Sequence, residues 1–164
     1  MYGAVLEKLC QVLRFFVGFL MMALAVPVGM QVISRYTGVI PSYLWTEELA
    51  TFIFVWVVML GSMIAVWEGT HFDVRVLSDA SSPLGAMLQS GIVLVMMIMF
   101  ALLFAWYGIE YAKFGYIQNS VMMRANLMIT YVSVPIAGVI WTLFASYRLY
   151  EIFQRYVATK RAMA

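Results

Sequence analysis

Residues 49–67 read LATFIFVWVVMLGSMIAVW, an apolar run that contains no Asp, Glu, Lys or Arg. A helix needs about 20 residues to cross a hydrocarbon core about 30 Å thick, so this stretch predicts a transmembrane helix. Three more runs of this kind cover residues 15–34, 84–109 and 127–147. We therefore expect an all-α integral membrane protein with four transmembrane helices.

The composition makes lipid the expected surrounding of this chain. Of its 164 residues, 65% are hydrophobic and 11% are charged, and the mean hydropathy is +0.92. Soluble proteins contain about 45–50% apolar and about 25% charged residues. Because the connections between the four runs are too short for a soluble domain, we expect a single membrane domain over residues 1–164, with membrane lipids as partners. The net charge of +2 does not indicate nucleic-acid binding.

Both ends of the chain predict amphipathic helical segments at the membrane surface. In residues 1–14 and after residue 147, apolar residues recur at helical spacing among charged ones, as in helices that lie in the interface. The first segment leads into an apolar run that continues past Ala23-Leu24-Ala25 to Ile33. Cleavage there as a signal peptide would cut a span in half, so we expect the N-terminal segment to be retained.

Basic residues predict the orientation, because they favour the cytoplasmic side of a membrane. With four spans, both termini and the central connection share one side. That side carries more basic residues than the other, which predicts a multi-pass membrane protein with both termini in the cytoplasm. The first side has Lys8, Arg14, Arg75, Arg148, Arg155, Lys160 and Arg161, and the other has Arg35, Lys113 and Arg124.

The spans lack the chemistry that transport or catalysis would need. Transporters place ionisable groups or broken helices near the bilayer midplane, whereas every charge here lies at a span end or in a connection. Pro27 and Pro135 predict bends in the first and fourth spans, which neighbouring groups can accommodate. His71 with Glu68 and Asp73 is a weak metal-binding set, and a solvated loop explains these residues. We expect no enzyme activity, no metal and no cofactor.

The second span has a face that suits another helix. Glu47, Phe54, Gly61 and Glu68 repeat at intervals of seven, and such a repeat drifts by only about 20° per heptad on an α-helix. Ala65, one turn after Gly61, completes a notch of small residues that lets another helix backbone approach. The helix that fills it belongs either to this chain's own spans or to another subunit.

The start of this span carries a capping signal. Thr46 is expected to cap the helix. Glu47 and Glu48 follow in the first turn, where the helix dipole stabilises each acid by about 0.3–1 kcal/mol.

These residues form an ordered motif: Arg35-Tyr36, then Trp45-x-Glu47-Glu48, then Phe54-x-Trp56-x-x-x-Leu60-Gly61-x-x-x-Ala65-x-x-Glu68-Gly69-x-His71. With four spans and this length, the motif resembles the small membrane subunit of tripartite ATP-independent periplasmic (TRAP) transporters. Thr51 and Trp67 depart from the family pattern, which often has basic residues near these positions.

The resemblance implies a non-catalytic scaffold in a sodium-driven importer of the bacterial inner membrane. The importer's substrate would be an organic acid, such as a dicarboxylate, a sugar acid or a sialic-acid-like compound. In that family a large membrane subunit carries the sodium and substrate sites, and a soluble periplasmic protein captures the acid. The small subunit is then a brace for the large one. The residues expected at the partner interface are Arg35, Trp45, Glu47, Glu48, Phe54, Gly61, Ala65, Glu68 and His71.

The connection at residues 110–126 mixes aromatic rings with cations. Tyr111, Lys113, Tyr116 and Arg124 are the residues that we expect to help dock the periplasmic binding protein, and an ordinary wet loop is the alternative. The rival function is a self-contained four-helix bundle that acts as a homo-oligomeric exporter or a membrane chaperone.

Overall fold

The computed structural model describes residues 2–38, 41, 43–69 and 83–163. Within these residues the chain is helical, and four helices are long and apolar enough to cross a membrane, which confirms the predicted fold class. The helices extend beyond the predicted apolar runs because the amphipathic ends continue them. The elements are α1 (Tyr2–Thr37), α2 (Trp45–Glu68), α3 (Pro83–Tyr116), the short α4 (Met128–Tyr131) and α5 (Ser133–Met163).

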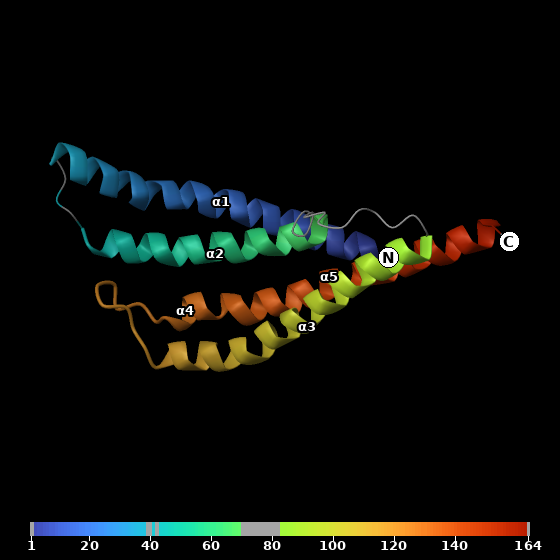
Figure 1. Cartoon of the computed structure of the whole chain (residues 1–164). Helices are drawn as coiled ribbons and strands as arrows, with labels where there is room; N and C mark the ends of the chain where they lie inside the picture. Colours follow the sequence, from blue (N-terminus) through green and yellow to red (C-terminus); the bar gives the residue numbers. More distant parts are fainter. Residues whose placement is uncertain (1, 39–40, 42, 70–82, 164) are drawn as a thin grey trace.

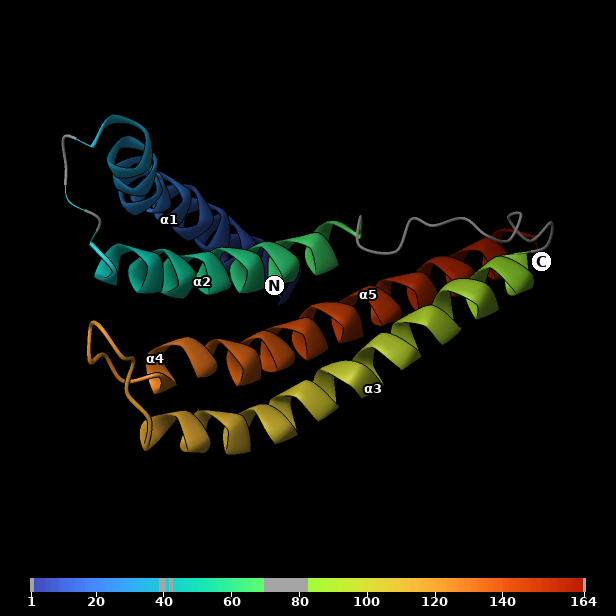
Figure 2. The same cartoon turned by 60° about the vertical axis from the view of Figure 1, so that its left-hand side comes forward.

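The helices form an open layer in the order α1, α2, α5, α3 (Figure 1). α1 packs mainly on α2, α3 packs mainly on α5, and contacts between α2 and α5 join the two hairpins. The view in Figure 2 keeps this order. We call the end with the α1–α2 and α3–α4 connections the loop end, and the end with both termini the terminal end.

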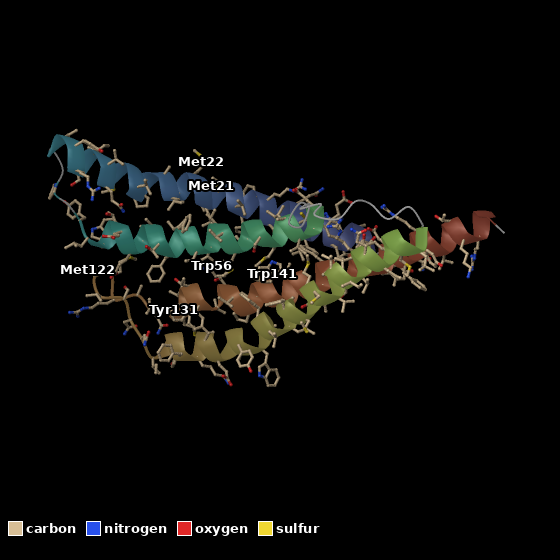
Figure 3. All side chains as sticks on the ribbon, viewed as in Figure 1. Met21, Met22, Trp56, Met122, Tyr131 and Trp141 are labelled. Carbon is tan, nitrogen blue, oxygen red and sulfur yellow. The ribbon has the colours of Figure 1, made fainter. Side chains whose placement is uncertain are left out.

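The buried core of this layer is small and combines α1, α2 and α5. Many large apolar side chains stay exposed, and Met22, at 75% exposure, points away from the layer on α1 (Figure 3). Lipid or a partner must cover such surface, because exposing this much apolar surface to water is unfavourable. The buried core residues are Cys10, Leu13, Leu60, Met63, Val66, Ala137 and Phe144.

α3 and α5 approach each other closely through small residues. A Cβ added to Gly138 would lie 2.5 Å from the backbone N of Ala105, and one added to Gly108 would lie 2.8 Å from the N of Pro135. On α3, small residues recur at spacings of four and three, which lets helix backbones meet in a membrane. This set, which the sequence analysis did not single out, is Ala101, Ala105, Gly108, Ala112 and Gly115.

The two prolines within the spans have different effects. α1 passes through Pro27 as one helix, so the bend expected there does not interrupt it. The fourth span is interrupted at Val132, between α4 and α5, because Pro135 has no N–H to donate to the carbonyl one turn earlier. Polar groups bond the carbonyls beside this break: Trp56 Nε1 donates to the Ile129 carbonyl over 3.0 Å, and Ser133 Oγ donates to the Thr130 carbonyl over 2.6 Å.

Candidate partner interface

The predicted face of the second span stays open in the folded chain. Phe54 is 55% exposed and Val58 is 48% exposed. A Cβ added to Gly61 would meet no atom of the described residues within 4 Å, so the helices of this chain do not fill the space beside Gly61. We call this face the α2 stripe; it comprises Glu47, Thr51, Phe54, Val58, Gly61, Ala65 and Glu68.

The side of α2 away from the stripe anchors the helix in the protein. Leu60, Met63 and Val66 are buried there, and they belong to the core cluster together with Phe144 of α5. α2 is therefore held from one side, while the middle of the α2 stripe, at Phe54, Val58 and Gly61, is left uncovered.

At the terminal end, α1 and α5 both contact the last turn of α2. Arg14 Nη2 lies 2.7 Å from Glu68 Oε1, with these side chains 55% and 40% exposed. Gly69 adopts a left-handed conformation with φ of 76° and caps the helix through its N–H to the Ala65 carbonyl. Arg148 Nη1 donates to the Val66 carbonyl over 3.3 Å, where a cation complements the helix dipole. Glu68 thus has a partner within this chain, and His71 lies outside the described residues.

At the loop end, the two adjacent glutamates differ. Glu48 Oε1 accepts a hydrogen bond from the Met122 N–H over 2.9 Å, and Glu48 Oε2 accepts one from the Met123 N–H over 2.8 Å. Glu48 thereby holds the α3–α4 connection against the first turn of α2, beside which Met122 lies (Figure 3). Glu47 is exposed and forms no ion pair with any residue that the structure describes.

The capping role expected for Thr46 is wrong. α2 begins one residue earlier, at Trp45, and its cap residue Leu44 makes no side-chain cap hydrogen bond. Thr46 Oγ1 instead donates to the Tyr43 carbonyl over 2.7 Å. Because Thr46 already lies inside the first turn, its hydroxyl bonds backward rather than receiving an N–H. Glu47 and Glu48 do lie in the first turn, as predicted.

The α3–α4 connection is a closed loop with its own hydrogen bonds. The Leu127 N–H donates to the Gln118 carbonyl over 3.0 Å, and Asn126 Nδ2 donates to the Tyr116 carbonyl over 2.8 Å. Arg124 has a positive φ of 53°, which is unusual for a residue other than glycine. The loop therefore has a defined shape before any partner binds.

The four docking candidates have different surroundings. Tyr111 stacks on Tyr131 with ring centroids 4.0 Å apart, so its ring also holds α3 to α4. Lys113, Tyr116 and Arg124 are all exposed at the loop end. Arg124 directly follows Met122 and Met123, whose N–H groups donate to Glu48, whereas Lys113 and Tyr116 belong to the last turn of α3.

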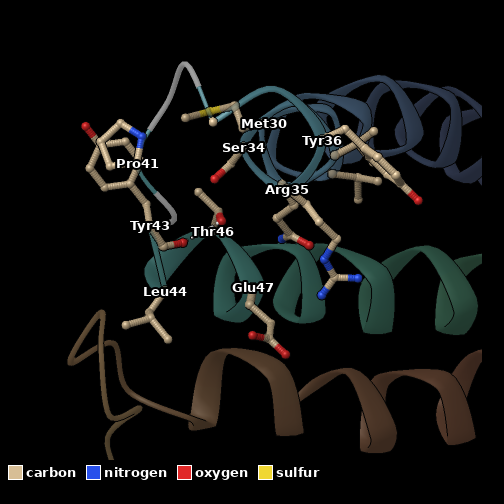
Figure 4. A pocket seen from close by; sticks show the side chains of 13 residues that line it. Met30, Ser34, Arg35, Tyr36, Pro41, Tyr43, Leu44, Thr46 and Glu47 are labelled. Atoms are coloured by element: carbon tan, nitrogen blue, oxygen red, sulfur yellow. Dashed lines mark hydrogen bonds between the residues drawn. The ribbon is translucent and has the colours of Figure 1, made fainter.

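A cavity of about 840 Å³ separates the loop-end turns of α1 and α2 (Figure 4). Arg35 lies on its α1 side and Glu47 on its α2 side. Trp45, the remaining loop-end candidate, is 40% exposed and lies beside Tyr43, with ring centroids 6.2 Å apart. Within the described residues, no group of three or more His, Cys, Asp and Glu is placed to hold a metal ion.

The comparisons with known proteins identify the family. The model for the tripartite ATP-independent periplasmic transporters, DctQ component, matches residues 24–155. The chain belongs to this family. Comparison with curated proteins gives no match. As a DctQ component, the chain is a small TRAP membrane subunit and a multi-pass protein of the inner membrane, and membership implies a large membrane subunit and a binding protein as partners.

Proposed function

We propose that this DctQ component is the scaffold subunit of a sodium-driven TRAP importer of an organic acid. The α2 stripe braces the large subunit, and the loop-end surface helps dock the periplasmic binding protein, with both termini in the cytoplasm. The four apolar runs hold no acidic or basic residue, which supports placing the sodium and substrate sites on the large subunit. The chain then acts as one membrane domain.

The observation that carries this proposal is the unfilled notch on a firmly held helix. α2 is held at both ends. At its start Glu48 binds the α3–α4 connection, and in its last turn Glu68 pairs with Arg14 while Arg148 donates to the Val66 carbonyl. A helix positioned in this way loses little freedom on binding, which lowers the cost of association. Gly61 and Ala65 leave room for a helix backbone, and Phe54 and Val58 flank that room with apolar surface.

The proposal is tested by filling the notch. Gly61→Leu is expected to fold, because a Cβ at this position meets no atom of the described residues within 4 Å, yet to block close approach of a partner helix. We expect a large loss of large subunit co-purified with the tagged chain. Gly91→Leu, on α3, is the matched control, since Gly91 is also half-buried with open space around its Cβ position.

If both variants retain the large subunit at the wild-type level, the α2 stripe is not the partner surface. Transport is measured by uptake of a labelled organic acid into vesicles that contain the whole transporter, with and without an imposed sodium gradient. Uptake at the same rate with and without the sodium gradient would contradict sodium coupling. Solute movement by this chain reconstituted alone would contradict the scaffold role and favour the self-contained exporter.

A further inference from the structure

The cavity between α1 and α2 has two charged residues at its mouth and mainly apolar residues, with Gln31 among them, deeper on α1. α1 and α2 diverge toward the loop end (Figure 1), and the cavity of about 840 Å³ lies where they separate. Arg35 and Glu47 line it from the facing helix ends (Figure 4). Val28 and Val32 line it deeper on α1, and at 1.5 Å per residue Val28 lies about 10 Å below Arg35 along the helix.

The two charges at the mouth have no partners of their own. Neither Arg35 nor Glu47 forms an ion pair in the part of the chain that the structure describes. Ser34 and Thr46 line the same cavity and add neutral polar atoms near the mouth. The mouth therefore presents one cation and one anion to whatever enters, so a ligand with a single kind of charge would meet one like charge.

We propose that this cavity binds a zwitterionic aminophospholipid, with the phosphate at Arg35 and the primary ammonium at Glu47. Guanidinium groups bind phosphate through paired, charge-assisted hydrogen bonds, and a primary ammonium donates three hydrogen bonds to acceptors such as a carboxylate. An anionic headgroup without an amine would face repulsion from Glu47. A choline headgroup carries the cation but has no N–H to donate.

The apolar wall below the mouth favours a lipid over a soluble phosphate compound. Arg35 and Glu47 lie at the end of membrane-crossing helices, where headgroups meet the hydrocarbon. Val28, Met30 and Val32 offer apolar surface to the acyl chains beneath the headgroup. Binding there would fill the gap between the diverging helices. The inference does not depend on the large subunit, so it stands or fails separately from the proposed function.

The test uses the full chain in lipid nanodiscs, followed by native mass spectrometry of the lipids that stay bound. The discs contain equal amounts of phosphatidylethanolamine, phosphatidylcholine and phosphatidylglycerol. We expect phosphatidylethanolamine to be retained about tenfold over the other two, as one charged hydrogen bond allows. Glu47→Gln should abolish the preference for the amine, and Arg35→Gln should reduce retention of all three lipids.

Lys113→Gln and Glu110→Gln are matched controls, because they remove one cation and one anion at the same end of the protein, on α3, without altering the cavity. Both should retain lipid as the wild type does. Soluble phosphoethanolamine, added at the same concentration, should not compete. Equal retention of the three lipids by the wild type, unchanged retention in Arg35→Gln, or unchanged selectivity in Glu47→Gln would overturn the proposal.

Discussion

The two hairpins of this subunit use small residues in opposite ways. In the α3–α5 hairpin, Gly138 is so close to Ala105 that even a methyl group would collide with backbone. In the α1–α2 hairpin, Gly61 has open space around it, and the helices diverge toward the loop end. Small residues thus close one hairpin within the chain, while in the other they leave a surface uncovered. The same residue type serves internal packing in one place and, in our proposal, a partner in the other.

The largest expected effect separates these two glycines. Gly138→Ala places a Cβ against the backbone of Ala101 and Ala105, which cannot rotate away, so the helices must move apart. We expect a loss of about 1–3 kcal/mol in the free energy of unfolding, measured by denaturant titration in detergent. Gly61→Ala should leave that free energy unchanged or raise it by up to about 1 kcal/mol, since alanine favours helix. Equal effects of the two would remove the distinction between the hairpins.

The next effect distinguishes the two adjacent glutamates at the start of α2. Glu48→Gln weakens two charge-assisted hydrogen bonds to the α3–α4 connection, whereas Glu47→Gln removes none to a described residue. Hydrogen exchange at the Met122 and Met123 amides should accelerate several-fold in Glu48→Gln and stay at the wild-type rate in Glu47→Gln. Unchanged exchange in Glu48→Gln would mean that the loop holds its shape unaided.

A smaller effect is expected where α2 meets the break in the fourth span. Trp56→Phe removes the hydrogen bond to the Ile129 carbonyl and keeps an aromatic ring. Hydrogen bonds within membrane proteins contribute about 0.6 kcal/mol on average, so thermal unfolding in detergent should shift slightly downward. Phe52→Leu, at a half-buried position of the same helix, is a control for ring packing; a larger shift for the control would show that packing, and not the hydrogen bond, matters.

The smallest effect concerns the ion pair at the terminal end. Glu68→Gln breaks the contact with Arg14, but both side chains are partly exposed, and many such pairs contribute little or nothing measurable to stability. Any loss in unfolding free energy should vanish at 1 M salt, where charges are screened within about 3 Å. A loss that persists in high salt would indicate that Glu68 acts through packing.

Sequence patterns located the helices and the open face but not the links between distant segments. Uninterrupted apolar runs placed all four membrane-crossing helices. The heptad of Glu47, Phe54, Gly61 and Glu68 identified a face of α2 whose middle, at Phe54 and Gly61, the fold leaves uncovered. Periodicity within one helix carries this information. Whether the chain's own helices cover Gly61 required the structure, because the answer depends on where the other helices lie.

The anchors at the ends of α2 could not be read from local sequence. Glu48 and Met122 are 74 residues apart in the chain, and Arg14 and Glu68 are 54 apart, so only the fold brings them together. The close contact of α3 with α5 did have a sequence signal that the prediction missed: small residues recur on α3 from Ala101 to Gly115 at spacings of four and three. The capping prediction for Thr46 was wrong because Thr46 lies inside the first turn of the helix. There its hydroxyl donates to the Tyr43 carbonyl and does not accept a hydrogen bond from a backbone N–H.

The central claim is that the α2 stripe is the surface that meets the large subunit. It is tested most directly by placing a photoreactive benzoylphenylalanine at Val58, on the stripe, or at Val95, on α3, in the assembled transporter. The side chains replaced are similarly exposed, at 48% and 56%. Our account predicts covalent capture of the large subunit from position 58 and capture of lipid alone from position 95. Capture of the large subunit from position 95 and not from position 58 would contradict it.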